Sequence, residues 1–298
     1  MSTTQTEKNP SNVQKSSPRA EAFKTFMKRL LKNKAAVVGG LIILFIILVG
    51  LIGPFLVKTD PNAQNLLNKL QAPSKEHWFG TDNFGRDIFS RIVHGTKLTL
   101  MVGFLSVIIG GVLGVVLGIV AGYYGGMVDT ITMRIMDILL AFPGMLLALA
   151  IVSVLGGSLI NVIIAVGIFS IPAFARIVRG STLQVKKLEY IDAVRALGAS
   201  DIRIIFKHIL PNILSPIMVQ ATMRIATAIL TAAGLAYLGL GAQPPTPEWG
   251  AMLSDGRTYM HNASHMVLIP GIMIVVVVLA FNIFGDGLRD ALDPKMKQ

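Results

Sequence analysis

The stretch EYIDAVRALGASDIRIIFKHILPN, residues 189–212, interrupts an otherwise apolar second half of the chain. Apolar runs of the length that crosses a bilayer flank it on both sides. A membrane protein that places so many charged residues in one internal loop presents a surface to something in the aqueous phase. This loop is therefore the first candidate for a docking surface.

The loop has the pattern of two short helices joined by a tight turn. Its apolar residues lie three or four apart, which predicts two helices with one apolar face each: Leu188, Ile191, Val194 and Leu197, then Ile202, Ile205, Phe206 and Ile209. Asp192 and Arg195 are spaced to pair at i, i+3. Gly198 predicts a left-handed helix end, and Ser200 or Asp201 predicts the cap of the second helix. An ordinary amphipathic connector between two spans would show the same pattern.

Composition identifies the class of protein. Of 298 residues, 53% are hydrophobic and 14% are charged, whereas a soluble domain carries about 25% charged residues. The formal net charge of +11 does not indicate nucleic-acid binding, because the basic residues gather beside apolar runs, as membrane topology requires. The chain has no cysteine, which excludes disulfides and thiolate sites. We expect an all-α polytopic membrane protein with six transmembrane helices.

Six apolar segments are each close to the ~20 residues that a helix needs to cross a bilayer. We expect spans at about 35–57, 98–122, 135–155, 159–178, 213–240 and 267–284. Pro211 is placed to start or bend the fifth span. The predicted organisation is a tail and interfacial helix over 1–34, the first span and an external loop over 35–97, a core transmembrane domain over 98–284 that contains the loop at about 180–212, and a C-terminal tail over 285–298.

The N-terminal region divides into two parts. Residues 1 to about 20 are rich in Ser, Thr, Asn, Gln and Lys, which predicts a disordered tail. Over residues 21–34, apolar and basic residues alternate at helical spacing, which predicts a basic amphipathic helix at the headgroup boundary. A charged lead-in that only sets topology is the alternative.

Basic residues near the spans predict the orientation. Two dense clusters are expected on the cytoplasmic side: Lys28, Arg29, Lys32 and Lys34, then Arg176, Arg179, Lys186 and Lys187. Six spans then return the C-terminus to the same side. The loop over residues 58–97 also carries basic residues, but it is long and mixed in charge, where the rule weakens.

The second apolar segment carries Gly110, Gly114, Gly118 and Gly122, one every four residues. Glycines at this period bare one helix face and let another backbone approach closely. Close packing inside a bundle is the first interpretation, and a helix that slides or rotates during transport is the alternative.

Charged residues inside apolar segments are functional candidates, because one at the bilayer centre costs ~2.5–3.5 kcal/mol. Arg224, well inside the fifth span, either holds a substrate carboxylate or pairs with another helix. Arg134 and Asp137 are expected to pair with each other at the cytoplasmic boundary. His261 and His265 have a spacing that suits a metal pair only in a helix, and we expect solvated histidines and no metal site.

Four motifs resemble those of one family of transport proteins. The acidic–Ala–Gly–Leu–Pro pattern of residues 189–212 resembles the EAA signature of ABC importer permeases, although Asp192 stands where the family usually has Glu and Val194 where it has Ala. Three further stretches resemble the external loops and C-terminal signature of the dipeptide, oligopeptide and nickel branch: HWFGTDNFGRD at 77–87, QPPTPEWG at 243–250 and GDGLRDALDP at 285–294. One departure is Ala232, where many relatives carry Glu.

The resemblance implies a type I ABC importer permease fold and a C-type subunit in the bacterial cell membrane, with both termini cytoplasmic. Such a subunit would form half of a translocation pathway for di- or oligopeptides; nickel, a metal chelate or a glutathione-like peptide is the alternative cargo. The implied partners are a homologous permease in a heterodimer, two cytoplasmic ATP-binding subunits, an extracytoplasmic substrate-binding protein and the lipid bilayer, with no nucleic acid.

The resemblance also assigns site residues. It places a set of loop residues against the ATPase: Glu189, Asp192, Ala193, Arg195, Gly198, Ala199, Ser200, Asp201, Leu210 and Pro211. A second set either contacts the binding protein or only shapes the external loops, with Trp249 in an interfacial belt: Asp82, Arg86, Asp87, Glu248 and Trp249.

We expect no enzymatic activity and no catalytic residue in this chain. No G-x-x-x-x-G-K-[ST] loop occurs, so this chain is expected to bind no cofactor, with ATP and Mg²⁺ on partner subunits. A secondary transporter driven by an ion gradient is the rival from another class, but it predicts carboxylates within spans and inverted repeats with broken helices, neither of which is clear here.

Overall fold

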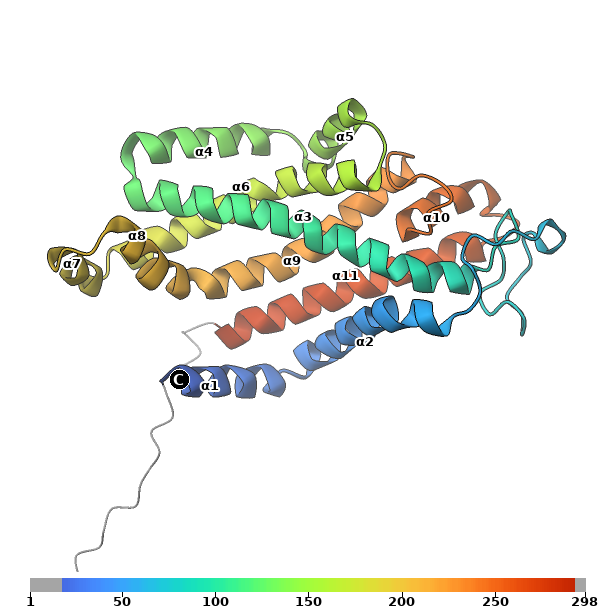
Figure 1. The fold of residues 1–298 in the computed structure, drawn as a ribbon, viewed down its shortest axis with the longest axis horizontal. Coiled ribbons are helices and arrows are strands. Elements are labelled where there is room, and N and C mark those ends of the chain that lie inside the picture. Colours follow the sequence, from blue (N-terminus) through green and yellow to red (C-terminus); the bar gives the residue numbers. More distant parts are fainter. Residues whose placement is uncertain (1–17, 293–298) are drawn as a thin grey trace, which may run out of the picture.

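A computed structural model describes residues 18–292, and its side chains from Lys24 onward (Figure 1). The described chain is built of helices, in this order: α1 Pro18–Lys32, α2 Lys34–Leu56, η1 Leu66–Asn68, α3 Ile88–Tyr124, α4 Gly126–Ala141, α5 Gly144–Leu155, α6 Leu159–Lys186, α7 Glu189–Ala196, α8 Asp201–Ile204, η2 Ile205–Ile209, α9 Leu210–Tyr237, α10 Trp249–Gly256, η3 Arg257–Tyr259 and α11 His265–Leu292. The all-α prediction is confirmed. The predicted disordered tail lies outside the described residues as far as residue 17, and α1 already begins at Pro18.

Five helical stretches are long and apolar enough to cross a membrane: α2, α3, α6, the continuous stretch from α8 to α9, and α11. Most of them run past the predicted ends, because a helix continues after its apolar part has ended. Thus α3 begins at Ile88 rather than near residue 98. At the other end of the chain, α11 continues to Leu292, so the predicted tail over 285–298 is helical as far as it is described.

The third predicted span, 135–155, is wrong as a single helix. It is divided between α4 and α5, whose axes differ by 90° at Phe142 and Pro143. Phe142 is extended, as the residue before a proline prefers to be. A Cβ on Gly144 would lie 2.0 Å from the ring of Phe169, so the start of α5 also needs glycine to approach α6.

The glycines of α3 form a close seam with α6, which confirms the close-packing prediction. Cβ atoms on Gly110, Gly114, Gly118 and Gly122 would lie 2.5–2.9 Å from atoms of α6, including its backbone carbonyl oxygens. No side chain fits at that distance, so the two helices touch along most of their shared length.

Two ion pairs fasten α4 to α6. Arg176 donates to Asp137 at 2.6 Å, and Arg179 donates to Asp129 through two nitrogens. The predicted pair of Arg134 with Asp137 is therefore wrong, because the Asp137 carboxylate faces Arg176 on α6 instead of Arg134 on its own helix. Arg134 is exposed.

The long helices run side by side along the length of the molecule, and the connections gather at its two ends (Figure 1). One end carries α1, α7, α8 and the last turns of α11. The other end carries α10 and the long connection over residues 57–87. The basic clusters and the polar stretch over residues 189–212 thus lie at the same end.

Candidate functional site

The candidate coupling loop, residues 189–212, turns at Gly198 as predicted. This residue has φ +81°, a left-handed conformation that glycine enters at little cost. The amide of Gly198 donates to the carbonyl of Arg195 at 2.9 Å, and that of Ala199 donates to Val194 at 3.3 Å. This bond pair is a Schellman motif, which ends α7 sharply. No atom lies within 4 Å of a Cβ added to Gly198, so the backbone angle alone demands glycine.

The apolar faces of the loop are only partly buried. Ile191 from α7 is 0% exposed and packs with Ile204, Ile209 and Ile213 from the helix that follows. By contrast, the other predicted face residues lie largely outside the core: Leu188, Leu197, Ile202 and Phe206 are 46%, 87%, 70% and 66% exposed. The predicted stripes are therefore exposed at these positions. The loop keeps an apolar anchor beneath and shows an apolar surface to the outside.

The second predicted helix is not separate from the fifth span. The turns of α8 continue through a π-helical turn, Ile205–Ile209, into α9 without a break. Pro211 lies in the first turn of α9, as predicted. Since proline has no N–H and crowds the carbonyl four residues earlier, a wider turn before it relieves the helix. Ser200 lies at the N-cap position of α8, but its side chain donates or accepts no capping bond.

Polar contacts fix the loop to the membrane helices. The hydroxyl of Tyr123, at the end of α3, donates to Asp201 at 2.6 Å. The amide of Asn212 donates to the Tyr190 hydroxyl at 3.1 Å, which ties α7 to the start of α9. Asp192 and Arg195 pair at 3.0 Å, as their spacing predicts. These bonds join α8 to α3 and α7 to α9.

Most residues assigned to the ATPase contact lie on the surface of the loop. Exposed members are Glu189, Asp192, Ala193, Arg195, Gly198, Ser200, Asp201 and Pro211, whereas Ala199 and Leu210 are half-buried. The sequence reasoning missed Leu197, Ile202 and Phe206 as surface residues. For Leu197 and Ile202 the nearby glycine turn was the available signal, because a turn at the tip of a loop has little to bury against.

At the opposite end, the predicted docking residues Asp82 and Arg86 are buried. They are 5% and 2% exposed, and the Arg86 Nε lies 2.5 Å from the Asp82 Oδ2. Arg91 Nε lies 3.7 Å from the same oxygen, and Arg86 Nη2 lies 3.5 Å from Asp255 Oδ2. Two arginines and two aspartates therefore balance one another, as buried charges must. Asp87 accepts from the Ser90 amide at 2.7 Å, and so caps α3.

Glu248 and Trp249 are also buried, at 4% and 0% exposure. The Trp249 Nε1 donates to the Ile92 carbonyl at 3.0 Å, and the Thr99 hydroxyl donates to Glu248 at 3.2 Å. The other carboxylate oxygen accepts from the Ala251 amide at 2.9 Å and caps α10. Burial raises the pKa of Glu248.

These contacts correct the prediction for the external loops. Asp82, Arg86, Glu248 and Trp249 do not present their side chains to a binding protein, and Trp249 is not in an interfacial belt. They shape this end of the molecule instead, which was the alternative interpretation. The physical reason is that a buried ion pair and a buried indole N–H each need partners inside the protein, and these residues supply one another.

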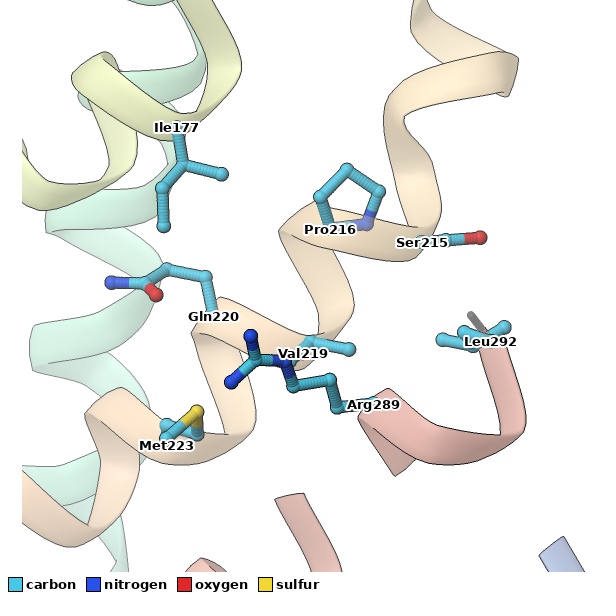
Figure 2. A pocket seen from close by; sticks show the side chains of 8 residues that line it. All are labelled: Ile177, Ser215, Pro216, Val219, Gln220, Met223, Arg289 and Leu292. Carbon is cyan, nitrogen blue, oxygen red and sulfur yellow. The ribbon is translucent and has the colours of Figure 1, made fainter. Parts of the chain in front are cut away.

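A pocket of about 470 Å³ opens between α6, α9 and α11. Figure 2 shows the side chains that line it: Ile177, Ser215, Pro216, Val219, Gln220, Met223, Arg289 and Leu292. The Arg289 side chain extends from α11 toward α9 (Figure 2). Among described residues, no ion pair or hydrogen bond of its side chain is formed, which leaves a positive charge facing the pocket.

Arg224 follows the pocket residue Met223 in α9 and is half-buried. Its side chain has no ion pair or hydrogen bond with another described residue of this chain. It lies one helical turn beyond Gln220, which lines the pocket. The sequence reasoning found Arg224 and missed Gln220, an uncharged residue of the same apolar run, and Arg289, which follows the last apolar run.

His77 and His265 each have one polar side-chain contact, and His261 is exposed. His265 Nε2 lies 3.1 Å from the Thr81 carbonyl, and His77 Nδ1 lies 2.8 Å from Asp87. In the part of the chain that is described, no three His, Cys, Asp or Glu side chains are grouped as metal ligands would be.

Comparison with known families gives two matches. The family described as "Binding-protein-dependent transport system inner membrane component" matches residues 114–298. The family described as "N-terminal TM domain of oligopeptide transport permease C" matches residues 22–73. Together they cover the coupling loop, the glycine seam from Gly114 onward and the N-terminal helices.

Individual proteins are similar over nearly the whole chain. The "Dipeptide transport system permease protein DppC" of Alkalihalophilus pseudofirmus is 54% identical over 281 residues, which are 94% of this chain and 91% of that protein. The "Glutathione transport system permease protein GsiD" of Pectobacterium atrosepticum is 50% identical over 92% of both chains.

A solved structure has the same fold. The inward-facing MetNI methionine ABC transporter aligns with a TM-score of 0.54 over 67% of this chain and 96% of that chain. The identity is 22%, so this likeness concerns the fold alone.

Proposed function

This chain belongs to the family of binding-protein-dependent transport system inner membrane components, in the dipeptide/oligopeptide branch of ABC importer permeases, and from this we propose that it forms half of a translocation pathway for di- or oligopeptides. The observation that carries the proposal is the coupling loop. It combines a rigid turn, a buried anchor at Ile191 and an exposed apolar tip, and it is fixed to the ends of two spans.

The loop would be the docking surface for a separate ATP-binding subunit. The exposed residues Leu197, Ile202 and Phe206 give it the apolar contact area that a protein interface needs at its centre. The full set of partners is a homologous permease in a heterodimer, two ATP-binding subunits that hold ATP and Mg²⁺, and an extracytoplasmic substrate-binding protein. ATPase closure shifts the permease between two states only if the loop binds differently in each.

The proposed orientation places both termini in the cytoplasm. Support comes from the arrangement of the helices, since α1, the coupling loop and the end of α11 share one end of the molecule (Figure 1). The basic residues of that end agree with the positive-inside rule. The network of Asp82, Arg86 and Arg91 then faces the extracytoplasmic side.

The cargo follows from the relatives and from the free cations beside the pathway. The relative DppC is a dipeptide permease by name, and a dipeptide carries a carboxylate. Arg224 and Arg289 are two cations without a partner among described residues, and each can hold a carboxylate as it passes. A glutathione-like peptide is the second candidate, favoured by the similarity to GsiD. Nickel or a metal chelate is less favoured, because the positive charges of Arg224 and Arg289 do not attract a metal cation.

Two measurements test this function. The tagged chain should bring down the second permease and two ATP-binding subunits from detergent-solubilised membranes. Deletion of its gene should abolish uptake of a labelled dipeptide or of glutathione and leave ⁶³Ni uptake unchanged. Purification without any ATP-binding subunit, together with uptake that follows an ion gradient, would instead identify a secondary transporter.

A further inference from the structure

A second pocket lies where α1, the start of α2 and the last turns of α11 meet. Its volume is about 520 Å³, and its lining is Arg29, Lys32, Asn33, Gly287, Asp290 and Ala291. The Asn33 side chain accepts from the Ala36 amide at 3.2 Å, which caps α2 and separates it from α1. Beyond this break α1 packs against α11 (Figure 1). The pocket is therefore a gap between three helices, set by the cap at Asn33.

The lining of this pocket carries an excess of positive charge. Arg29 is half-buried and Lys32 is exposed, and neither forms an ion pair with any side chain that the structure describes. Asp290 lines the opposite wall and accepts from the Asn33 amide nitrogen at 3.4 Å. Two cations without an ion pair among the described residues therefore face one carboxylate that already has a donor. Such a lining suits a group with negative charge.

The length of α2 sets the depth of the pocket in the membrane. Its 23 residues extend about 34 Å, close to the ~30 Å of a hydrocarbon core. Its outward side chains are apolar and exposed, among them Leu41, Phe45 and Leu48, at 59%, 65% and 43%. Because the pocket adjoins the first residue of α2, it lies where this apolar surface begins. That level is occupied by lipid headgroups.

We propose that this pocket binds the phosphate of an anionic phospholipid from the leaflet on the side of the coupling loop. Arg29 and Lys32 hold the phosphate, and Asp290 sets an upper limit to the negative charge that the pocket accepts. Leu31, 62% exposed on α1, directly precedes Lys32 and is available to the acyl chains. A free phosphate ion has the same charge but lacks this apolar contact.

The test uses the complete transporter purified in detergent. Native mass spectrometry would count the lipids bound after incubation with an equimolar mixture of phosphatidylglycerol and phosphatidylcholine. The wild-type complex should retain phosphatidylglycerol preferentially. The double variant Arg29→Gln/Lys32→Gln should weaken this retention about tenfold or more, since a charge-assisted hydrogen bond from a basic side chain to a phosphate oxygen contributes about tenfold by itself. Asp290→Asn should strengthen it.

Matched variants separate a site from general attraction. Lys24→Gln/Lys28→Gln removes the same charge from exposed positions of the same helix that do not line the pocket, and it should change retention by less than twofold. Asp286→Asn is the corresponding control for Asp290. Equal losses in both double variants would overturn the proposal. Displacement of the retained lipid by 10 mM inorganic phosphate would overturn the lipid assignment, because it would show a site for the free ion.

Discussion

The hydroxyl of Tyr123 donates a 2.6 Å hydrogen bond to Asp201, although 78 positions separate the two residues in the chain. Tyr123 ends the glycine-bearing helix α3, and Asp201 begins the helical stretch that becomes α9. The bond therefore joins the coupling loop to a helix that reaches the opposite end of the molecule. It is a direct physical link between the surface proposed to meet the ATPase and the external loops.

Tyr123→Phe should weaken coupling and leave assembly intact. It removes one hydrogen bond worth about 1 kcal/mol, about a fivefold change in an equilibrium between two conformations. The ratio of peptide transported to ATP hydrolysed in proteoliposomes should fall by about that factor. Tyr124→Phe is the control, because the Tyr124 side chain is 53% exposed and its hydroxyl makes no such bond. An equal fall in both variants would contradict the role given to Tyr123.

Gly198→Val should uncouple transport from ATP hydrolysis. A side chain at φ +81° costs about 1–2 kcal/mol and opens the turn that ends α7. Gly239→Val offers a close match, since Gly239 has φ +84°, ends α9 with the same bond pattern and also has open space around it. Both variants bear a similar backbone cost, but only Gly198→Val should lose substrate-stimulated ATPase activity. Normal stimulation in Gly198→Val would show that the loop is not the coupling element.

Asp82→Asn should destabilise the end of the molecule that carries α10. The substitution leaves Arg86 and Arg91 with less negative charge than they need, and breaking a buried pair costs about 3–5 kcal/mol. Thermal unfolding of the purified complex should shift to a clearly lower temperature. Asp60→Asn, at an exposed position of the same connection, should leave the transition unchanged. A similar small shift for both would mean that the network contributes little.

Glu248 should make stability depend on pH. Burial raises its pKa, so the folded protein holds this proton at pH values where the unfolded chain has released it. Its contribution to stability is greatest below the usual value of about 4.3 and falls as pH rises toward the raised pKa. In the wild type, the contribution of Glu248 to the unfolding temperature should fall as the pH rises across this range. Glu248→Gln should lack it, whereas Glu189→Gln, at an exposed residue of α7, should keep it.

Arg224→Gln should reduce selection of a free carboxylate. If the guanidinium holds the peptide carboxylate, the wild type transports a dipeptide faster than its C-terminal amide, and the variant loses the difference. Arg224→Lys should restore part of it, because the charge remains although the fork of donors is lost. Competition between the two labelled peptides measures this ratio directly. An unchanged preference in Arg224→Gln would remove Arg224 from the pathway.

The sequence predicted the elements whose causes are local. The left-handed turn at Gly198, the glycine seam of α3 and the pair of Asp192 with Arg195 all depend on residues close together in the chain, and all are confirmed. The break of the third span was also visible as Phe142-Pro143-Gly144, but hydrophobicity over a long window hides a single proline.

Contacts between distant segments were beyond such reasoning. Asp137 has a suitable partner in Arg134, three residues earlier on its own helix, yet it pairs with Arg176 on another helix. Asp82 and Trp249 look like surface residues in a loop, but helices α3 and α10 cover them. Burial of this kind depends on how helices meet, which no short pattern contains.

The seam between α3 and α6 makes the two helices a single mechanical part. Turning α3 by one residue position, about 100°, would bring Val115 and Ile119 to the places of Gly114 and Gly118, where even a Cβ lies under 3 Å from α6. The pair is thus locked against axial rotation and moves as one strut about 55 Å long. A tilt of this pair that begins at Tyr123 therefore also moves Arg91, so the end with the coupling loop and the end with the Asp82 network move together.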